Sequence, residues 1–256
     1  LRELWDGRTP DGGQALESFA VGAALGGAFS VGTSWLAKGA ERVRGALKRG
    51  ASSKVEGTGK AGVEPGSTPI EHRYAIDPET GKLIHFDWTA TRRVDPVKDA
   101  HIIERVSEIK SRLSKKVLKK GGNFGYAEVD IPVVEQKEFY SSSQVDFTSG
   151  NSNLEGFSLK PENPIFRATK APDKKGDDFV READTEYKIL NDLAEKIGEN
   201  NNVAGKVKLF TEKDTCGSCN NIISQFKERY PNIKIEVIHN GGELIAPKNM
   251  SNIGEY

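Results

Sequence analysis

The last third of the chain alternates helix and strand patterns, and this alternation limits its possible folds more than any other feature. Apolar side chains recur along one side of a helix over residues 183–197, and residues 205–211 are typical of a buried strand. A second helix pattern, 219–230, ends at Pro231, and a second strand pattern follows at 233–238. This order predicts an α/β domain with a parallel, right-handed strand–helix–strand unit.

Weaker patterns precede this unit. Residues 72–88 indicate two short strands around a Pro-Glu-Thr-Gly turn, and residues 98–118 have the apolar spacing of one helix. Strands are expected within 123–131 and 138–147. The polar stretch 148–180 separates these strands from the last third of the chain. The loops that flank a substrate pocket are expected within 132–180, where the sequence shows no motif.

The first 69 residues predict a different organisation. Residues 1–50 are rich in small residues and are interpreted as the partly helical end of a larger carrier region, since the chain begins at Leu1 and its only methionine is Met250. Within them, residues 18–37 are uncharged and long enough to span a bilayer, so they form either a membrane-contacting segment or a small-residue helix packed on upstream chain. Residues 51–69 have the composition of a flexible linker.

These boundaries place a catalytic domain at residues 70–256, with its core at about 98–240. The whole chain has 37 basic and 37 acidic residues, so its net charge favours neither a nucleic-acid nor a membrane partner. Two cysteines in one Cys-x-x-Cys motif also exclude a disulfide-framed secreted scaffold.

The two cysteines, Cys216 and Cys219, lie where the strand 205–211 gives way to the next helix. A helix N-terminus favours the thiolate, which both redox and metal chemistry require. A thioredoxin-like protein would need a further strand and a closing helix, for which little chain remains after the strand 233–238. A structural zinc site would need a fourth ligand, and the four histidines show no partner spacing.

Two acidic residues, Asp184 and Glu186, stand at the start of the preceding helix. Acidic residues commonly occupy first helical turns, where the helix dipole favours them. Together with the cysteines they give an acid-x-Glu motif at one helix N-terminus and a Cys-x-x-Cys motif at the next. This layout is similar to the H-x-E and P-C-x-x-C signature of the zinc nucleobase deaminases.

The segments NFGYAEVDI, READTEYKIL and LFTEKDTCGSCNNIISQFKERYPNIKIEV carry the resemblance, which covers about residues 100–240. The chain resembles the bacterial toxin deaminases of polymorphic toxin systems, a branch of the cytidine deaminase-like superfamily. Two positions depart from the common pattern. Asp184 stands where most of the superfamily has His, and Thr215 replaces the usual Pro.

The resemblance implies a three-layer α/β/α sandwich with a mixed sheet, preceded by a helical or flexible N-terminal region. It also implies that Asp184, Cys216 and Cys219 hold Zn²⁺ and leave one position for water, with Glu186 as general acid and base. Asn123 is the candidate contact for the nucleoside. The expected reaction is hydrolysis of a C–N bond of a cyclic amidine, cytosine to uracil in DNA or RNA.

The resemblance further implies the C-terminal toxin domain of a secreted interbacterial toxin, delivered to the cytoplasm of a target cell. Its expected partners are the nucleic acid substrate, a cognate immunity protein and the N-terminal carrier portion of the same polypeptide. Two alternatives remain on the residues alone: a thiol–disulfide protein using the cysteine pair, and a non-enzymatic binding module stabilised by zinc.

Overall fold

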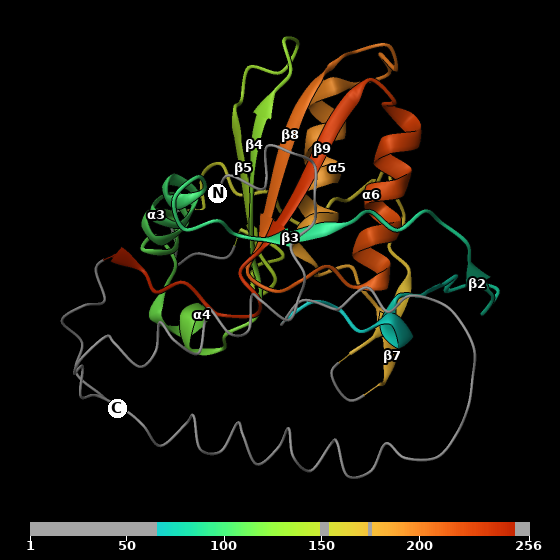
Figure 1. Ribbon diagram of the computed structural model, residues 1–256, viewed down its shortest axis with the longest axis horizontal. Helices are drawn as coiled ribbons and strands as arrows, with labels where there is room; N and C mark the ends of the chain where they lie inside the picture. Colours follow the sequence, from blue (N-terminus) through green and yellow to red (C-terminus); the bar gives the residue numbers. More distant parts are fainter. Residues whose placement is uncertain (1–65, 149–153, 174–175, 249–256) are drawn as a thin grey trace, which may run out of the picture. The chain divides into compact units, whose positions relative to one another are not determined.

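The computed structural model describes residues 66–148, 154–173 and 176–248, which all belong to a unit spanning Ala61–Tyr256 (Figure 1). The predicted carrier region 1–50, its uncharged segment 18–37 and most of the predicted linker lie outside the described residues. Within the described ranges, none of the helices combines the length and apolar character that crossing a bilayer requires.

A five-stranded mixed sheet forms the centre of the domain. Its strands, in spatial order, are β3 (Thr91–Arg93), β9 (Ile233–His239), β8 (Gly205–Thr211), β4 (Phe124–Asp130) and β5 (Glu138–Ser142). The predicted pairing of β8 and β9 is confirmed, since they run parallel from Gly205 opposite Ile233 to Thr211 opposite His239. β3 is also parallel to β9, whereas β4 is antiparallel to both β8 and β5.

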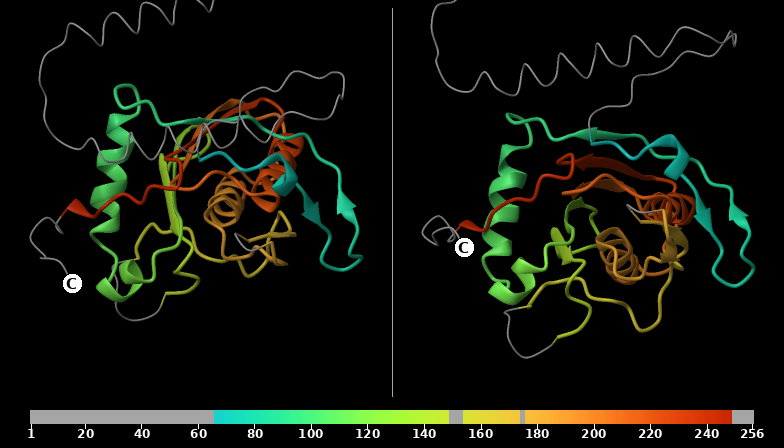
Figure 2. Two further views of the ribbon diagram at one scale, coloured as in Figure 1. Left: turned by 60° about the horizontal axis from the view of Figure 1, so that its bottom comes forward. Right: turned by 90° about the horizontal axis from the view of Figure 1, so that it is seen from below.

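Helices cover both faces of this sheet (Figures 1 and 2). One face packs against α5 (Thr185–Ile197) and α6 (Gly217–Arg229), and the other packs against α3 (Ala100–Lys110) and α4 (Lys115–Lys119). Adjacent sheet residues point to opposite cores: Leu209 packs on the α5/α6 side, and Phe210 packs on the α3 side. The predicted three-layer α/β/α sandwich is therefore confirmed.

A small antiparallel sheet lies beside α6. Its strands, in spatial order, are β2 (Leu83–Ile84), β1 (Ala75–Ile76), β6 (Lys170–Pro172) and β7 (Asp178–Val180), and a short 3-10 helix, η2 (Ile70–His72), precedes β1. The predicted hairpin within residues 72–88 is thus present as β1 and β2. Two strands, β6 and β7, form within the polar stretch 148–180, whose sequence shows no strand pattern.

The prediction of a single helix over 98–118 is wrong, because the structure has two helices there with a break between them. α3 ends at Lys110, and α4 starts only at Lys115, because Ser114 adopts an extended conformation and its Oγ accepts a hydrogen bond from the N–H of Val117 at 3.4 Å. Leu113 nevertheless joins the same apolar cluster as the helix residues. The apolar spacing therefore persists although the helix is interrupted.

Asp99 connects the sheet to α3 through a carboxylate that is fully buried. Its oxygens accept hydrogen bonds from Arg92 Nη1 at 2.6 Å, from the Asp95 N–H at 2.9 Å and from Lys208 Nζ at 3.3 Å. The Arg92 guanidinium, above all, holds the pKa of Asp99 well below its usual range, against the effect of burial.

We expect Asp99→Asn to lower the free energy of unfolding at pH 7 by about 2 kcal/mol, the order of a charge-assisted hydrogen-bond network. A depressed folded pKa means that this stability is present above about pH 4, the unfolded pKa, and is lost as the pH falls below it. Urea denaturation in EDTA between pH 7 and pH 3 measures the difference. A gap between the two proteins that stays constant down to pH 3 would contradict the assignment.

Candidate metal centre

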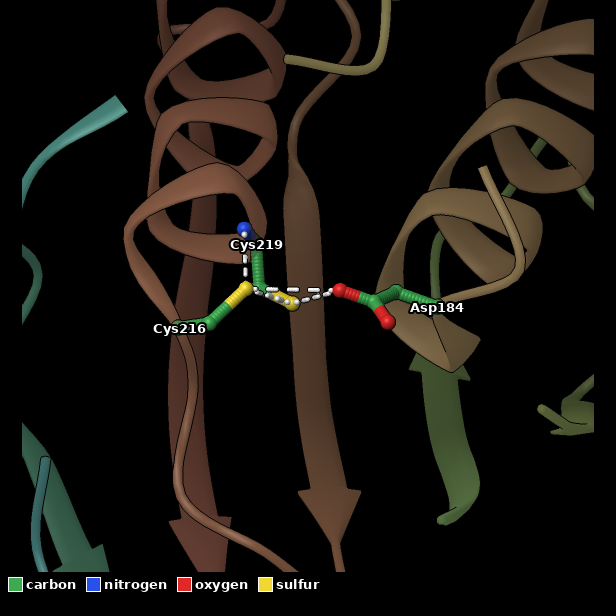
Figure 3. Close-up of side chains that lie close together, drawn as sticks. All are labelled: Asp184, Cys216 and Cys219. Atoms are coloured by element: carbon green, nitrogen blue, oxygen red, sulfur yellow. Dashed lines mark hydrogen bonds between the residues drawn. The ribbon is translucent and has the colours of Figure 1, made fainter. Parts of the chain in front are cut away.

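Two helices begin side by side at the same end of the central sheet, and each starts on a residue of the predicted site. Asp184 is the N-cap of α5, and Cys216 is the N-cap of α6. Cys219, in the first turn of α6, donates its backbone N–H to Cys216 Sγ at 3.2 Å. Figure 3 shows the three side chains pointing toward one another from the two helix ends.

The three side chains bring two sulfurs and one carboxylate oxygen to one point. Asp184 Oδ2 lies 3.0 Å from Cys219 Sγ and 3.3 Å from Cys216 Sγ, and the two sulfurs are 2.9 Å apart. Their donor atoms all lie within 4.8 Å of one another, and both cysteines are free thiols. A carboxylate oxygen and two thiolates suit a tetrahedral metal with one position for water, so this group could hold a metal ion.

The charges at this point also favour a cation. Burial raises the pKa of the Cys219 thiol well above its usual range, and the neighbouring Cys216 and Asp184 raise it further. A bound cation would reverse this effect, because it stabilises the thiolate and the carboxylate together. The donor set therefore fits a metal in charge as well as in the type and number of its ligands.

Glu186 lies in the first turn of α5, apart from the three gathered donors. Its side chain is buried, and its Oε2 accepts a hydrogen bond from Thr185 Oγ1 at 2.8 Å. Burial, followed by the charge of Asp184, raises the pKa of Glu186 to about 7. A carboxyl group with such a pKa can both accept and release a proton near neutral pH.

Asn123 links the start of α5 to the end of β8 and the residues directly after it. Its Nδ2 donates to Thr185 Oγ1 at 3.0 Å and to Thr211 Oγ1 at 2.7 Å, and its Oδ1 accepts from the Lys213 N–H at 3.0 Å. Hydrogen bonds thus run from Asn123 through Thr185 to Glu186. Asn123 also borders the cavity described below, but its contact with a nucleoside stays a prediction.

Two glycines allow the helix starts to approach their neighbours closely. A Cβ on Gly125 in β4 would lie 2.7 Å from Thr185 Cβ, so a larger residue would displace the turn that carries Glu186. A Cβ on Gly217, between the two cysteines, would lie 1.6 Å from the backbone oxygen of Tyr74. The glycine of the CGSC motif therefore lets the small sheet pack directly on the first turn of α6.

The loop before Cys216, which contains Thr215, is fixed by hydrogen bonds. Asp214 Oδ1 accepts from Thr91 Oγ1 and from the Thr215 N–H, both at 2.8 Å, and its Oδ2 accepts from the Thr68 N–H at 2.6 Å. Thr215 is fully buried, and its carbonyl accepts from Thr68 Oγ1 at 2.6 Å. Thr68, in the last part of the predicted linker, is thus joined to the loop of the site.

The gathered donors open into a cavity of about 710 Å³, a size typical of small-molecule sites. Glu186, Asp184 and both cysteines line it, together with segments from distant parts of the chain. The other lining segments are residues 66–69, His72, 122–123, 143–144, 172–173, Phe179, Arg181, Ala183, 213–214 and 241–242. The site is therefore built by both sheets and by the residues immediately before η2.

The chain matches a known family of proteins. The family model named Toxin-deaminase, described as the BURPS668_1122 family of deaminases, matches residues 106–241, just over half of the chain. The chain belongs to this family of deaminases. No curated protein and no solved structure matches it.

The matched span of this toxin deaminase contains Asn123, Asp184, Glu186, Cys216 and Cys219. The resemblance to toxin deaminases is thereby confirmed, and the thioredoxin-like alternative has no comparable support. β9 is the last strand in the described residues, which continue only to 248, so this part of the chain contains no further strand and closing helix.

Sequence reasoning missed Arg181, Thr185 and Asp214. Arg181 Nε donates to Asp184 Oδ2 at 2.8 Å, Thr185 contacts Glu186, and Asp214 fixes the loop before Cys216. Each of them lies within three residues of a predicted site residue. Their proximity along the sequence was the available signal, but only the structure shows which way their side chains point.

Proposed function

We propose that this toxin deaminase is a zinc-dependent hydrolase that converts cytosine to uracil in nucleic acid. The observation that carries the proposal is the meeting of Asp184, Cys216 and Cys219 beside the buried Glu186 in one cavity. Zinc is the metal that this mixed set of two thiolates and one carboxylate suits best, because it accepts sulfur and oxygen ligands in a tetrahedral arrangement.

Bound zinc would supply the Lewis acidity that activates a water molecule at neutral pH. Glu186 would accept a proton from that water and pass it to the ring nitrogen of the base. Glu186 would then take the second proton, from the hydroxyl now bound to the ring carbon, and deliver it to the amino group. The amino group leaves as ammonia, and the remaining oxygen forms the new carbonyl. The hydrogen bond from Thr185 orients Glu186 for both transfers.

The shape of the site favours a base that has left the helical stack. A cavity of about 710 Å³ accommodates one nucleotide rather than a duplex, and its border carries the half-exposed ring of Phe179. Bases that undergo chemistry are commonly extruded and stacked on aromatic or apolar side chains. These features support a nucleic acid substrate whose reacting base is unstacked.

Lysines next to the cavity support contact with the phosphate backbone. Lys115 and Lys116 in α4 and Lys120 directly after it are exposed, and the chain continues at once into Gly122 and Asn123 on the cavity border. Cations along the approach to a nucleotide pocket neutralise phosphates and strengthen binding at low salt.

The biological setting follows as part of the same proposal. The family is one of toxin deaminases, which supports a secreted toxin that acts in the cytoplasm of a target cell. Residues 1–50 would then belong to its carrier portion, with residues 18–37 in transient contact with a membrane, and an immunity protein would protect the producing cell.

Sequencing of DNA and RNA from bacteria that express the whole chain tests the proposal. We expect C-to-T changes in one of the two nucleic acids, and none in cells expressing the Cys216→Ser variant, which lacks one of the predicted zinc ligands. Absence of changes in both nucleic acids, with zinc retained by the purified chain, would rule out nucleic acid as the substrate. A purified chain that binds no zinc would rule out the metal mechanism.

The lysine triplet gives a separate prediction. We expect the triple variant Lys115→Glu, Lys116→Glu, Lys120→Glu to raise KM for a cytosine-containing oligonucleotide by about tenfold or more at low salt and to leave kcat nearly unchanged, because phosphate contacts bind without entering the reaction. The slope of log(kcat/KM) against log[salt] should become shallower. Steady-state kinetics at two or more salt concentrations measures both effects.

A matched control is the triple variant Lys196→Glu, Lys206→Glu, Lys234→Glu. These lysines are exposed at the end of α5 and at the starts of β8 and β9, away from the helix N-termini that form the site. It changes net charge by the same amount. An equal rise of KM in both variants would mean that general charge, and not a defined surface, governs binding.

A further inference from the structure

The ligand set of this site carries one more negative charge than the set with His. Two thiolates and one carboxylate bring three negative charges to a divalent cation, whereas a neutral His with two thiolates brings two. Excess negative charge at a metal lowers its ability to acidify water. The Asp184 site therefore needs a compensating positive charge that a His site does not.

Arg181 lies where it can supply that charge. Its Nε donates to Asp184 Oδ2 at 2.8 Å, and the same oxygen faces the sulfurs of Cys219 and Cys216 at 3.0 and 3.3 Å. The Arg181 and Asp184 side chains are only 19% and 14% exposed, so solvent screens their attraction weakly. The guanidinium therefore contacts the very atom that would bind the metal.

The protein also fixes the position of Arg181. Its guanidinium carbon lies 4.6 Å from the centre of the Phe179 ring, and its backbone N–H donates to the carbonyl of Thr169 at 3.1 Å. The Arg181 carbonyl accepts the N–H of Asp184 at 3.3 Å, which closes the turn before α5. Contacts on both the backbone and the side chain hold the cation against the ligand carboxylate.

We propose that Arg181 is the positioning residue that makes Asp184 an effective metal ligand, by neutralising its charge and directing its Oδ2 toward the two cysteines. The inference rests on the proposed zinc site. With Arg181 included, the divalent cation, three anionic ligands and one guanidinium sum to zero, the same total as a neutral His with two thiolates. Arg181 and Asp184 thus act as a pair that replaces one His.

Zinc affinity tests the pair directly. We expect Arg181→Gln to weaken zinc binding by about 10–100-fold, the usual effect of losing a residue that supports a ligand. The effect should reverse when the ligand is neutral: in the Asp184→His background, Arg181→Gln should strengthen zinc binding, because the guanidinium then adds an uncompensated positive charge. Competition with a chromophoric chelator at pH 7 measures the affinity of all four proteins.

A matched control is Arg167→Gln, which removes an exposed arginine paired with Glu79 and should leave zinc affinity unchanged. Equal zinc affinity of wild type and Arg181→Gln, or the same loss in both ligand backgrounds, would overturn the proposal. If circular dichroism shows that Arg181→Gln is unfolded, Arg181→Lys decides: affinity within a few-fold of wild type supports charge compensation, and a larger loss overturns it. A wild-type chain without zinc affinity would instead refute the zinc site itself.

Discussion

Glu186→Gln should lower kcat for deamination by about 10²–10⁴-fold while zinc stays bound, because that is the usual contribution of a general acid and base. The amide fills the same space and still accepts the hydrogen bond that Thr185 donates at 2.8 Å, but it cannot take up a proton. Single-turnover kinetics on a cytosine-containing oligonucleotide, together with zinc content measured on the same sample, separates lost chemistry from lost metal.

Glu182→Gln is the matched control, because Glu182 lies four residues earlier with a side chain that is 47% exposed and paired with Lys160. It should retain wild-type activity. Residual activity of Glu186→Gln within about threefold of wild type would exclude Glu186 as the proton carrier, given the loss that such a role demands. Loss of zinc together with activity would assign Glu186 a structural or ligand role instead.

Glu212→Ala should destabilise the fold by about 3–5 kcal/mol, the cost of leaving one partner of a buried ion pair uncompensated. Glu212 follows β8, and its side chain is 1% exposed; it accepts hydrogen bonds from Lys110 Nζ at 2.5 Å, from the Ile245 N–H at 2.7 Å and from the Phe124 N–H at 3.1 Å. Its loss would leave a buried ammonium and two buried N–H groups without their acceptor.

Chemical denaturation in EDTA at pH 7 measures this loss without any contribution from metal binding. Lys110→Met should cost less than Glu212→Ala, because Glu212 would keep its two backbone donors. Glu195→Ala removes an exposed carboxylate from α5 and should change stability by less than about 0.5 kcal/mol. A larger cost for Lys110→Met than for Glu212→Ala would contradict the view that Glu212 is the centre of this network.

The elements predicted well from sequence are those whose pattern is long and local. β8, α6 and β9 each present seven or more residues with regular apolar spacing, and both faces of the sheet they form are covered by helices. The site motifs were readable for the same reason, since acid-x-Glu and Cys-x-x-Cys each occupy one helical turn. Their meeting depends on the parallel pairing of β8 and β9, which the element order already indicated.

The elements missed depend on partners far along the chain. β3 and β6 have only three residues each, too few to show a period, and β3 exists because it pairs with β9 more than a hundred residues away. The break before Ser114 came from a local cap that competed with a continuing apolar spacing. The role of Arg181 depends on a side-chain direction, which spacing alone does not specify.

The hydrogen bonds from Thr68 have a mechanical consequence. Thr68 is hydrogen-bonded to both Asp214 and Thr215. It therefore links the amino-terminal end of the described chain to the loop that leads into Cys216. A pulling force applied to the chain ahead of Thr68 would reach these hydrogen bonds before it reached any strand of the central sheet. Tension from the amino-terminal side would therefore act on the loop that carries Cys216 before it acted on the central sheet.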